Sequence, residues 1–188
     1  MAQLNILGLD HMGRSYDKTY ATLSRVKPSV ITLELSLHGY DGEVYLGKLF
    51  DDSLEMLATR EKFLKRSIRG GEFQAGYIFA RRNGLPLYVI DKTIVPPEEV
   101  VKYNIMAMEN PHDAFPYGKI PEELFEQWDY KVRNEFMAQV LDLLAEMYPR
   151  GNTSHVGGAD HIRQDNAEGA IPIQNLVRKF DRVIPHDI

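Results

Sequence analysis

VITLEL, from Val30 to Leu35, is the stretch of this sequence that decides the fold. Its nearly continuous apolar run is typical of a strand that is buried on both faces, as strands are in parallel sheets covered by helices. Ahead of it, residues 4–7 (LNIL) predict another strand, and the residues up to Val26 predict a helix that Ser15 or Asp17 caps. A strand, a helix and a second strand at this spacing indicate a β-α-β unit with parallel pairing and a right-handed crossover.

The rest of the chain continues this alternation of strands and helices. Helical periodicity with stop signals predicts further helices, and apolar runs bounded by Gly or Pro predict further strands. The expected helices cover residues 51–69, 72–82, 121–148 and 175–183, and the expected strands cover residues 85–90 and 153–156. Residues 96–120, which hold several prolines, predict no regular element. We expect one three-layer α/β domain over residues 1–188, with a mostly parallel sheet.

The composition of the chain excludes several kinds of partner and site. The net charge of −5 argues against nucleic acid as the main partner, because phosphate binding needs a concentrated basic face. The chain has no cysteine, which excludes disulfides and thiolate metal ligands. No apolar run approaches the ~20 residues of a membrane span. The GLDH motif that begins at residue 8, described below, leaves no room for a cleavable signal before it. We therefore expect a cytoplasmic protein without a membrane span, and association of identical chains stays open.

A short pattern occurs near both ends of the chain, as GLDH at residues 8–11 and GADH at residues 158–161. Each copy follows an apolar, strand-like run, and Glu34 follows the strand-like VITL in the same way. Ligands of α/β proteins gather beyond the carboxyl ends of parallel strands. Turn chemistry alone asks for Gly or Asp and not for His. We therefore expect His11, Glu34 and His161 to share one site.

Two imidazoles and one carboxylate fit a divalent metal such as zinc, manganese or cobalt, with positions left for water and substrate. A bound water would then become a nucleophile near neutral pH. The alternative for His11 is a structural hydrogen bond. Asp10 and Asp160 either orient the histidines or form the turns. A buried Glu34 needs a metal, hydrogen-bond donors or a cation, and a salt bridge to Arg133 is its structural alternative.

Other charged residues belong to the same prediction. Asp91 follows a predicted strand, which places it at the same edge of the sheet. Asp129 and Arg133 lie four residues apart in the apolar sector of the long predicted helix. They predict either a partly buried ion pair or, for Arg133, a group that holds a substrate carboxylate or an oxyanion. His155 is interpreted as a core residue that is satisfied by hydrogen bonds. The sequence contains neither a serine-hydrolase elbow nor a nucleotide-binding loop, which argues against serine and nucleotide chemistry.

The order of these motifs resembles the TraB/PrgY family, which is related to the Tiki proteins and more distantly to the erythromycin-esterase and ChaN-like proteins. The matching elements are LGLDH at 7–11, PSVITLEL at 28–35, VIDK at 89–92 after the 72–82 helix, RNEFMA at 133–138 and VGGADH at 156–161. Two positions depart from the family pattern. Lys92 stands where the family has the Arg of an Asp-Arg pair, and Ser36 to His38 stand where an Arg often follows the Glu strand.

The resemblance implies an α/β fold of the erythromycin-esterase/ChaN-like type, so that residues 1–188 form a TraB-like domain. It also implies a metal-dependent peptidase supported by manganese or cobalt, with His11, Glu34 and His161 as metal ligands or catalytic groups, assisted by Arg133. The family includes proteins that restrain a peptide pheromone, and ChaN-like relatives bind haem. Our prediction is therefore a metal-dependent hydrolase of a peptide or small-molecule substrate. The alternative is a non-catalytic peptide or signal binder.

Overall fold

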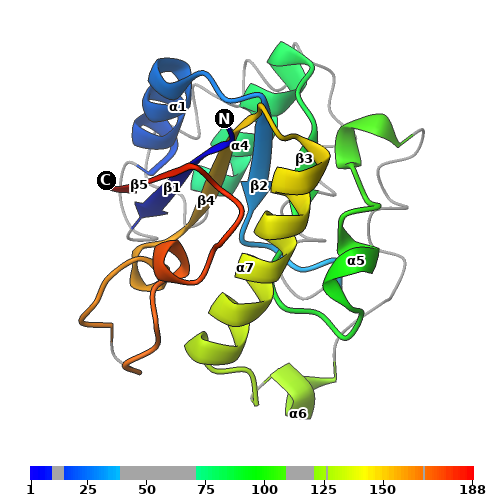
Figure 1. The fold of residues 1–188 in the computed structure, drawn as a ribbon, viewed down its shortest axis with the longest axis vertical. Helices are drawn as coiled ribbons and strands as arrows, with labels where there is room; N and C mark the ends of the chain where they lie inside the picture. The colour runs from blue at the N-terminus through cyan, green and yellow to red at the C-terminus, as the bar shows by residue number, and fades with distance from the viewer. Residues whose placement is uncertain (10–14, 39–70, 109–120, 126, 167) are drawn as a thin grey trace.

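The computed structural model describes residues 1–9, 15–38, 71–108, 121–125, 127–166 and 168–188. Their strands form one parallel sheet in the order β3-β2-β4-β1-β5 (Figure 1). The strands are β1 (Gln3–Leu9), β2 (Val30–Leu33), β3 (Leu87–Val89), β4 (Asn152–Gly158) and β5 (Arg182–Asp187). The predicted α/β class with a mostly parallel sheet is confirmed.

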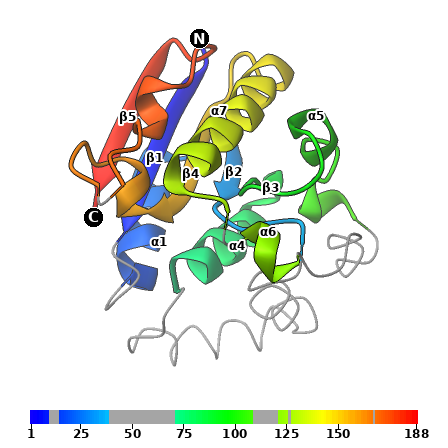
Figure 2. The same ribbon diagram turned by 90° about the horizontal axis from the view of Figure 1, so that it is seen from below.

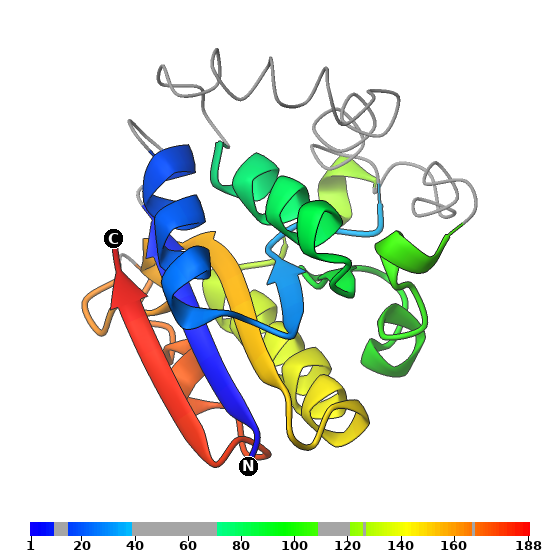
Figure 3. The same ribbon diagram turned by 90° about the horizontal axis from the view of Figure 1, so that it is seen from above.

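Helices cover both faces of this sheet, so the fold has three layers. Figures 2 and 3 show α1 and α4 against one face and α7 against the other. The helices are α1 (Ser15–Val26), α4 (Gly71–Asn83), α5 (Pro97–Val100), α6 (Glu122–Phe125) and α7 (Tyr130–Met147), with 3-10 turns η1 (Ile105–Ala107), η3 (Ala159–His161) and η4 (Ile173–Asn175). Helices on both faces explain why β2 reads as a continuous apolar run, since all four of its residues are buried.

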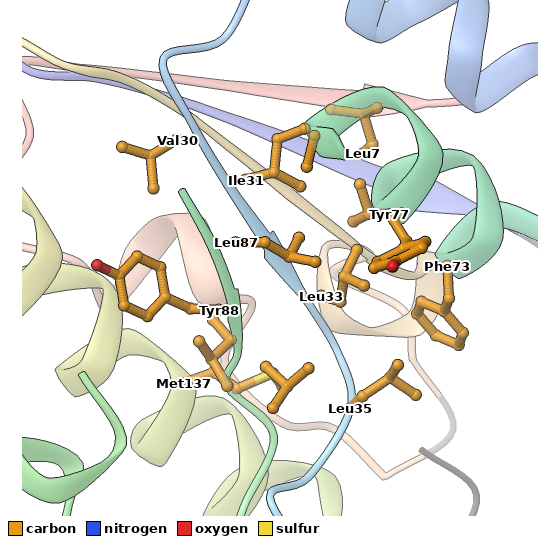
Figure 4. Close-up of a cluster of buried hydrophobic side chains, with 14 of the residues drawn as sticks. Leu7, Val30, Ile31, Leu33, Leu35, Phe73, Tyr77, Leu87, Tyr88 and Met137 are labelled. Carbon is orange, nitrogen blue, oxygen red and sulfur yellow. The ribbon is translucent and has the colours of Figure 1, made fainter. Parts of the chain in front are cut away.

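Side chains of β2 alternate between the two layers of helices. Figure 4 shows Leu33 on the side of Tyr77 from α4, whereas Tyr88 of the neighbouring β3 lies on the side of Met137 from α7. On the α4 side the packing is especially close, because a Cβ built on Gly76 would stand 2.6 Å from Leu33 Cδ2. The absence of a side chain at Gly76 therefore lets α4 approach the sheet closely.

Strand β4 lies at the centre of the sheet and aligns the strand ends. It pairs with β1 and β2 at once, so that His155 stands between Ile6 and Thr32. The predicted β-α-β unit therefore joins two parallel strands that are not neighbours. Because all strands run the same way, the residues that follow β2, β3 and β4 meet at one edge.

The long helix predicted over residues 121–148 is wrong as one element. The structure divides it into α6 and α7, because Asp129 has an extended backbone and accepts a hydrogen bond from the Val132 N–H (2.9 Å), which makes it the N-cap of α7. Phe136 and Val140 are buried on the predicted apolar face. Met147, in the last turn of α7, is 49% exposed.

The closing helix predicted over residues 175–183 is also wrong. In its place the chain forms η4 and then β5, which pairs with β1 from Gln3–Arg182 to Gly8–Asp187. Val183 and Ile184 are β-branched and favour a strand, and Pro185 is tolerated at the edge of a sheet. Pairing with the outer edge of β1 therefore outweighs the local helical pattern.

Some predicted elements lie outside the described residues, namely the 51–69 helix and part of the 96–120 segment, of which α5 and η1 are seen. Among the helices that the structure describes, none combines the length and the apolar character that a membrane crossing requires.

Candidate functional site

The carboxyl edge of the sheet gathers charged side chains from three consecutive strand ends. Glu34 follows β2, Asp91 lies just past β3, and His161 lies in η3, directly after β4. Arg133 and Asn134 reach the same place from the N-terminal part of α7. Four of these residues are more than 90% buried, the exception being Arg133, whose side chain is 19% exposed.

Glu34 is the centre of this cluster because both of its carboxylate oxygens are engaged. Oε1 accepts hydrogen bonds from Arg133 Nη2 (2.5 Å) and, with the imidazole protonated, from His161 Nε2 (2.8 Å). Oε2 accepts one from the Gly158 N–H (2.6 Å). Burial alone would raise the pKa of Glu34, but the charges of His161 and Arg133 and these hydrogen bonds lower it well below its ordinary value. Glu34 is therefore an anion at neutral pH.

Arg133 joins Glu34 to a second carboxylate. Its Nε and Nη2 donate to Asp91 Oδ1 (3.0 Å) and Oδ2 (2.8 Å), which is the bidentate geometry that suits a guanidinium. Asp91 Oδ1 also accepts from the Lys92 N–H (2.7 Å). Burial would lower the pKa of Arg133, but the two carboxylates raise it further above its ordinary range. The guanidinium is thus a fixed positive charge shared by Glu34 and Asp91.

Asn134 fixes the orientation and protonation of His161. Its side-chain Nδ2 donates to the Ile171 carbonyl (2.9 Å), so its Oδ1 faces His161 Nδ1, which must carry the proton of that hydrogen bond. His161 Nε2 is therefore the nitrogen that faces Glu34. Nε2 either carries a proton that it donates to Glu34, or it carries a lone pair directed at the same position beside Glu34.

This donor chemistry fits a divalent metal in one respect. An imidazole whose Nδ1–H is held by an amide oxygen and whose Nε2 lies 2.8 Å from a carboxylate oxygen has the arrangement of a metal-binding histidine beside a second ligand. Within the described ranges, no three His, Asp or Glu side chains are grouped closely enough to hold a metal ion. Glu34 and His161 could supply two ligands to a metal, and the third ligand expected from the sequence, His11, lies outside the described residues.

Aromatic side chains border the charged cluster. The ring of Tyr130 meets the His161 imidazole edge to face, with centroids 4.9 Å apart, and lies 5.7 Å from the Arg133 guanidinium carbon. Its hydroxyl donates to Asp160 Oδ2 in a long hydrogen bond (3.4 Å). Burial and the charge of Asp160 raise the pKa of Tyr130. The phenol therefore stays protonated at neutral pH.

Lys92 adds a second cation close to Asp91. Its Nζ lies 5.2 Å from the ring centre of Trp128 and 4.5 Å from that of Phe136, and it donates to the Thr93 carbonyl (2.9 Å). Burial lowers the pKa of this ammonium. Among the described residues, Lys92 is thus held beside the cluster by two aromatic faces and the Thr93 carbonyl.

The sequence predictions for this site can now be compared with the structure. Glu34, Asp91, His161 and Arg133 come together, and the salt bridge between Glu34 and Arg133 that was considered as a structural alternative is present. The predicted pair of Asp129 and Arg133 is not formed. Asp129 caps α7, as described above, while Arg133 reaches the sheet edge.

Two functional contacts were not predicted. Orientation of His161 comes from Asn134, while Asp160, for which orienting the histidine and forming the turn were both left open, bonds to Tyr130. The signal for Asn134 was its place beside Arg133 on the helix, which puts two polar residues side by side near the sheet edge. Asp10, like His11, lies outside the described residues.

Comparison with known proteins does not add to this description, because no family model, curated protein or solved structure matches the chain.

Proposed function

We propose that this protein is a metal-dependent hydrolase of peptide or similar amide bonds, with Glu34 and His161 at its centre. The observation that carries the proposal is the pair itself, in which an oriented imidazole nitrogen faces a buried, ionised carboxylate at 2.8 Å. Its position at the carboxyl edge of a parallel sheet is where α/β proteins bind ligands. The motif resemblance to the TraB/PrgY family supports the same reaction class.

Each residue has a definite part in this proposal. Glu34 and His161 would hold the metal together with His11, and the metal would lower the pKa of a bound water towards neutrality. In amide hydrolysis the water oxygen adds to the carbonyl carbon, the C–N bond breaks, and the leaving amine takes up a proton. Glu34 can accept the proton from water and return it to the amine, because a carboxylate that binds a metal keeps further lone pairs. Arg133 keeps Glu34 ionised and in place.

The second candidate is a non-catalytic binder of peptides or other signals. It is favoured by the saturation of the cluster, because Arg133 is bonded to both Glu34 and Asp91 and both oxygens of Glu34 have donors. A cluster paired in this way can bind a ligand through Tyr130 and Lys92 at its border without any reaction.

A cleavage assay separates the two candidates. The purified protein is incubated with a mixed-sequence peptide library and manganese, cobalt or zinc, and products are identified by mass spectrometry. Hydrolysis predicts metal-dependent cleavage that Glu34→Gln and His161→Asn each reduce by roughly 10²–10⁴-fold. Glu146→Gln is the matched control. This exposed carboxylate lies on α7, the helix that carries Arg133, and in the described residues it pairs only with Lys179. Cleavage that survives Glu34→Gln would disprove the site, and binding without cleavage would favour the second candidate.

A further inference from the structure

His155 lies beneath the cluster, on the central strand β4. Its imidazole is fully buried and stands beside Thr32, its register partner on β2. Two residues further along the chain, and on the same face of the sheet, Glu34 follows Thr32 and Gly157 follows His155. His155 therefore occupies the layer of the sheet directly below Glu34, where the sequence had predicted a core residue satisfied by hydrogen bonds.

The hydrogen bond to Thr32 engages the Nδ1 of His155 and leaves its Nε2 on the other side of the ring. Thr32 Oγ1 lies 3.0 Å from His155 Nδ1, and in the described part of the chain this is the one acceptor recorded for the threonine hydroxyl. We assign the hydroxyl as the donor, which makes Nδ1 the acceptor. Burial lowers the pKa of His155 to about 4, so the ring is neutral at pH 7 and its single proton lies on Nε2.

This Nε2–H is a buried donor without a partner among the described residues. Leaving such a group unpaired costs about 1–3 kcal/mol. The donor also lies close to the carboxylate of Glu34. A Cβ built on Gly157 would stand 3.1 Å from His155 Nε2 and 2.6 Å from Glu34 Oε2. Because Gly157 has no side chain, the imidazole donor and the carboxylate acceptor both lie over its backbone.

We propose that His155 is a binding residue of the site, whose Nε2–H donates to an oxygen atom that in turn donates to Glu34 Oε2. In the resting protein this oxygen belongs to a water molecule. This water would be oriented by one donor, His155, and one carboxylate acceptor, Glu34, and would be the water consumed in hydrolysis. That part of the inference rests on the proposed function. As a bound oxygen, it stands on the geometry of His155, Gly157 and Glu34 alone.

Two variants separate a binding role for His155 from a structural one. His155→Gln keeps an N–H donor near the position of Nε2, whereas His155→Phe fills the same space without any donor. The folding of both variants is checked by urea unfolding. We expect both variants to unfold cooperatively, with a loss of about 1–3 kcal/mol in the free energy of unfolding of His155→Phe, because the buried Thr32 hydroxyl loses its acceptor.

The decisive experiment is crystallography at neutral pH on the wild type and both variants, together with peptide cleavage. We expect an ordered oxygen within about 3.2 Å of both Nε2 and Glu34 Oε2 in the wild type, retained in His155→Gln and lost in His155→Phe. We also expect kcat/KM to fall at least about 10-fold in His155→Phe and to recover in part in His155→Gln.

The possible failures are distinguishable. A wild-type crystal structure without that oxygen, or with a protein acceptor on Nε2, overturns the inference whatever the activity. Wild-type turnover in a stable His155→Phe overturns the role in hydrolysis and leaves the proposed function standing. If no wild-type cleavage is found, the proposed function fails, and the crystallographic result alone decides whether His155 binds an oxygen.

Discussion

Two glycines on opposite faces of the sheet show how differently its two layers of helices are used. On the α4 face, a Cβ at Gly76 would stand 2.6 Å from Leu33 Cδ2; on the α7 face, a Cβ at Gly157 would stand 2.6 Å from Glu34 Oε2. The first close contact meets the flexible end of an apolar side chain. The second meets a carboxylate oxygen that the Gly158 N–H holds in place, while Arg133 holds the other oxygen. The α4 face therefore provides packing, and the α7 face holds the charges at the strand ends.

The largest effect on stability is expected where the α7 face loses its cation. Arg133→Met would leave Glu34 and Asp91 buried without their shared partner, and we expect a loss of about 3–5 kcal/mol in the free energy of unfolding. Urea unfolding at pH 7 measures this loss. Arg133→Lys keeps the charge but not the bidentate geometry, so its loss should be smaller. A stability of Arg133→Met equal to that of the wild type would show that the cluster is not held by this ion pair.

The next effect is a pH dependence that comes from the α7 face. The pKa of His155 is about 4 in the folded protein and near 6.5 when unfolded, so between these values the unfolded state binds the extra proton. Stability should therefore fall as the pH is lowered from 6.5 to 4, by a few kcal/mol in total. The carboxyl of Glu34, whose pKa is lowered, contributes a further loss only below pH 4.5. Urea unfolding across this range measures the slope, and His155→Phe should remove the part that belongs to His155; identical slopes would contradict the assignment.

The two glycines provide the direct comparison of the faces. Gly76→Ala should cost about 1–3 kcal/mol of stability through overpacking against Leu33, with cleavage activity per folded molecule unchanged. Gly157→Ala should cost a similar amount but should also displace Glu34, so that activity falls as well. Thermal unfolding and cleavage rates of both variants test this. Equal losses of activity in the two variants would remove the distinction between a packing face and a functional face.

The smallest effect is expected at the start of α7. Asp129→Ala removes the acceptor for the Val132 N–H and should cost about 1 kcal/mol, whereas Asp129→Asn should cost little because asparagine also caps helices. Since Arg133 follows within the first turn, activity should fall slightly in the alanine variant. Urea unfolding and cleavage rates give both values, and an unchanged stability in Asp129→Ala would show that the cap is unimportant.

The sequence predicted the inner part of this fold better than its edges. Apolar runs such as Val30–Leu33 identify buried strands, because a strand covered on both faces has no polar alternation to obscure it. The helix predicted over residues 175–183 overlaps only the start of β5, whose conformation depends on pairing with β1, a contact that local sequence does not encode. The break before α7 follows from one capping residue, Asp129, within an otherwise helical pattern.

For the candidate site, the residues at strand ends were predictable and their partners were not. Glu34, Asp91 and His161 each follow a strand, and parallel topology alone brings such positions to one edge. Which residue Arg133 would pair with depended on how α7 lies across the sheet, so the local spacing to Asp129 was misleading. His155 could not be distinguished from core residues, because its unpaired nitrogen is visible only in three dimensions.

The most direct test of the central claim is the metal content of the protein, measured by elemental mass spectrometry after incubation with manganese, cobalt or zinc and removal of free ions. The variants Glu34→Gln and His161→Asn are measured beside the wild type, with Gly76→Ala as the control on the other face. The account predicts about one divalent ion per chain in the wild type and in Gly76→Ala, and loss of that ion in both site variants. No bound ion in the wild type, or a full equivalent in both site variants, would contradict it.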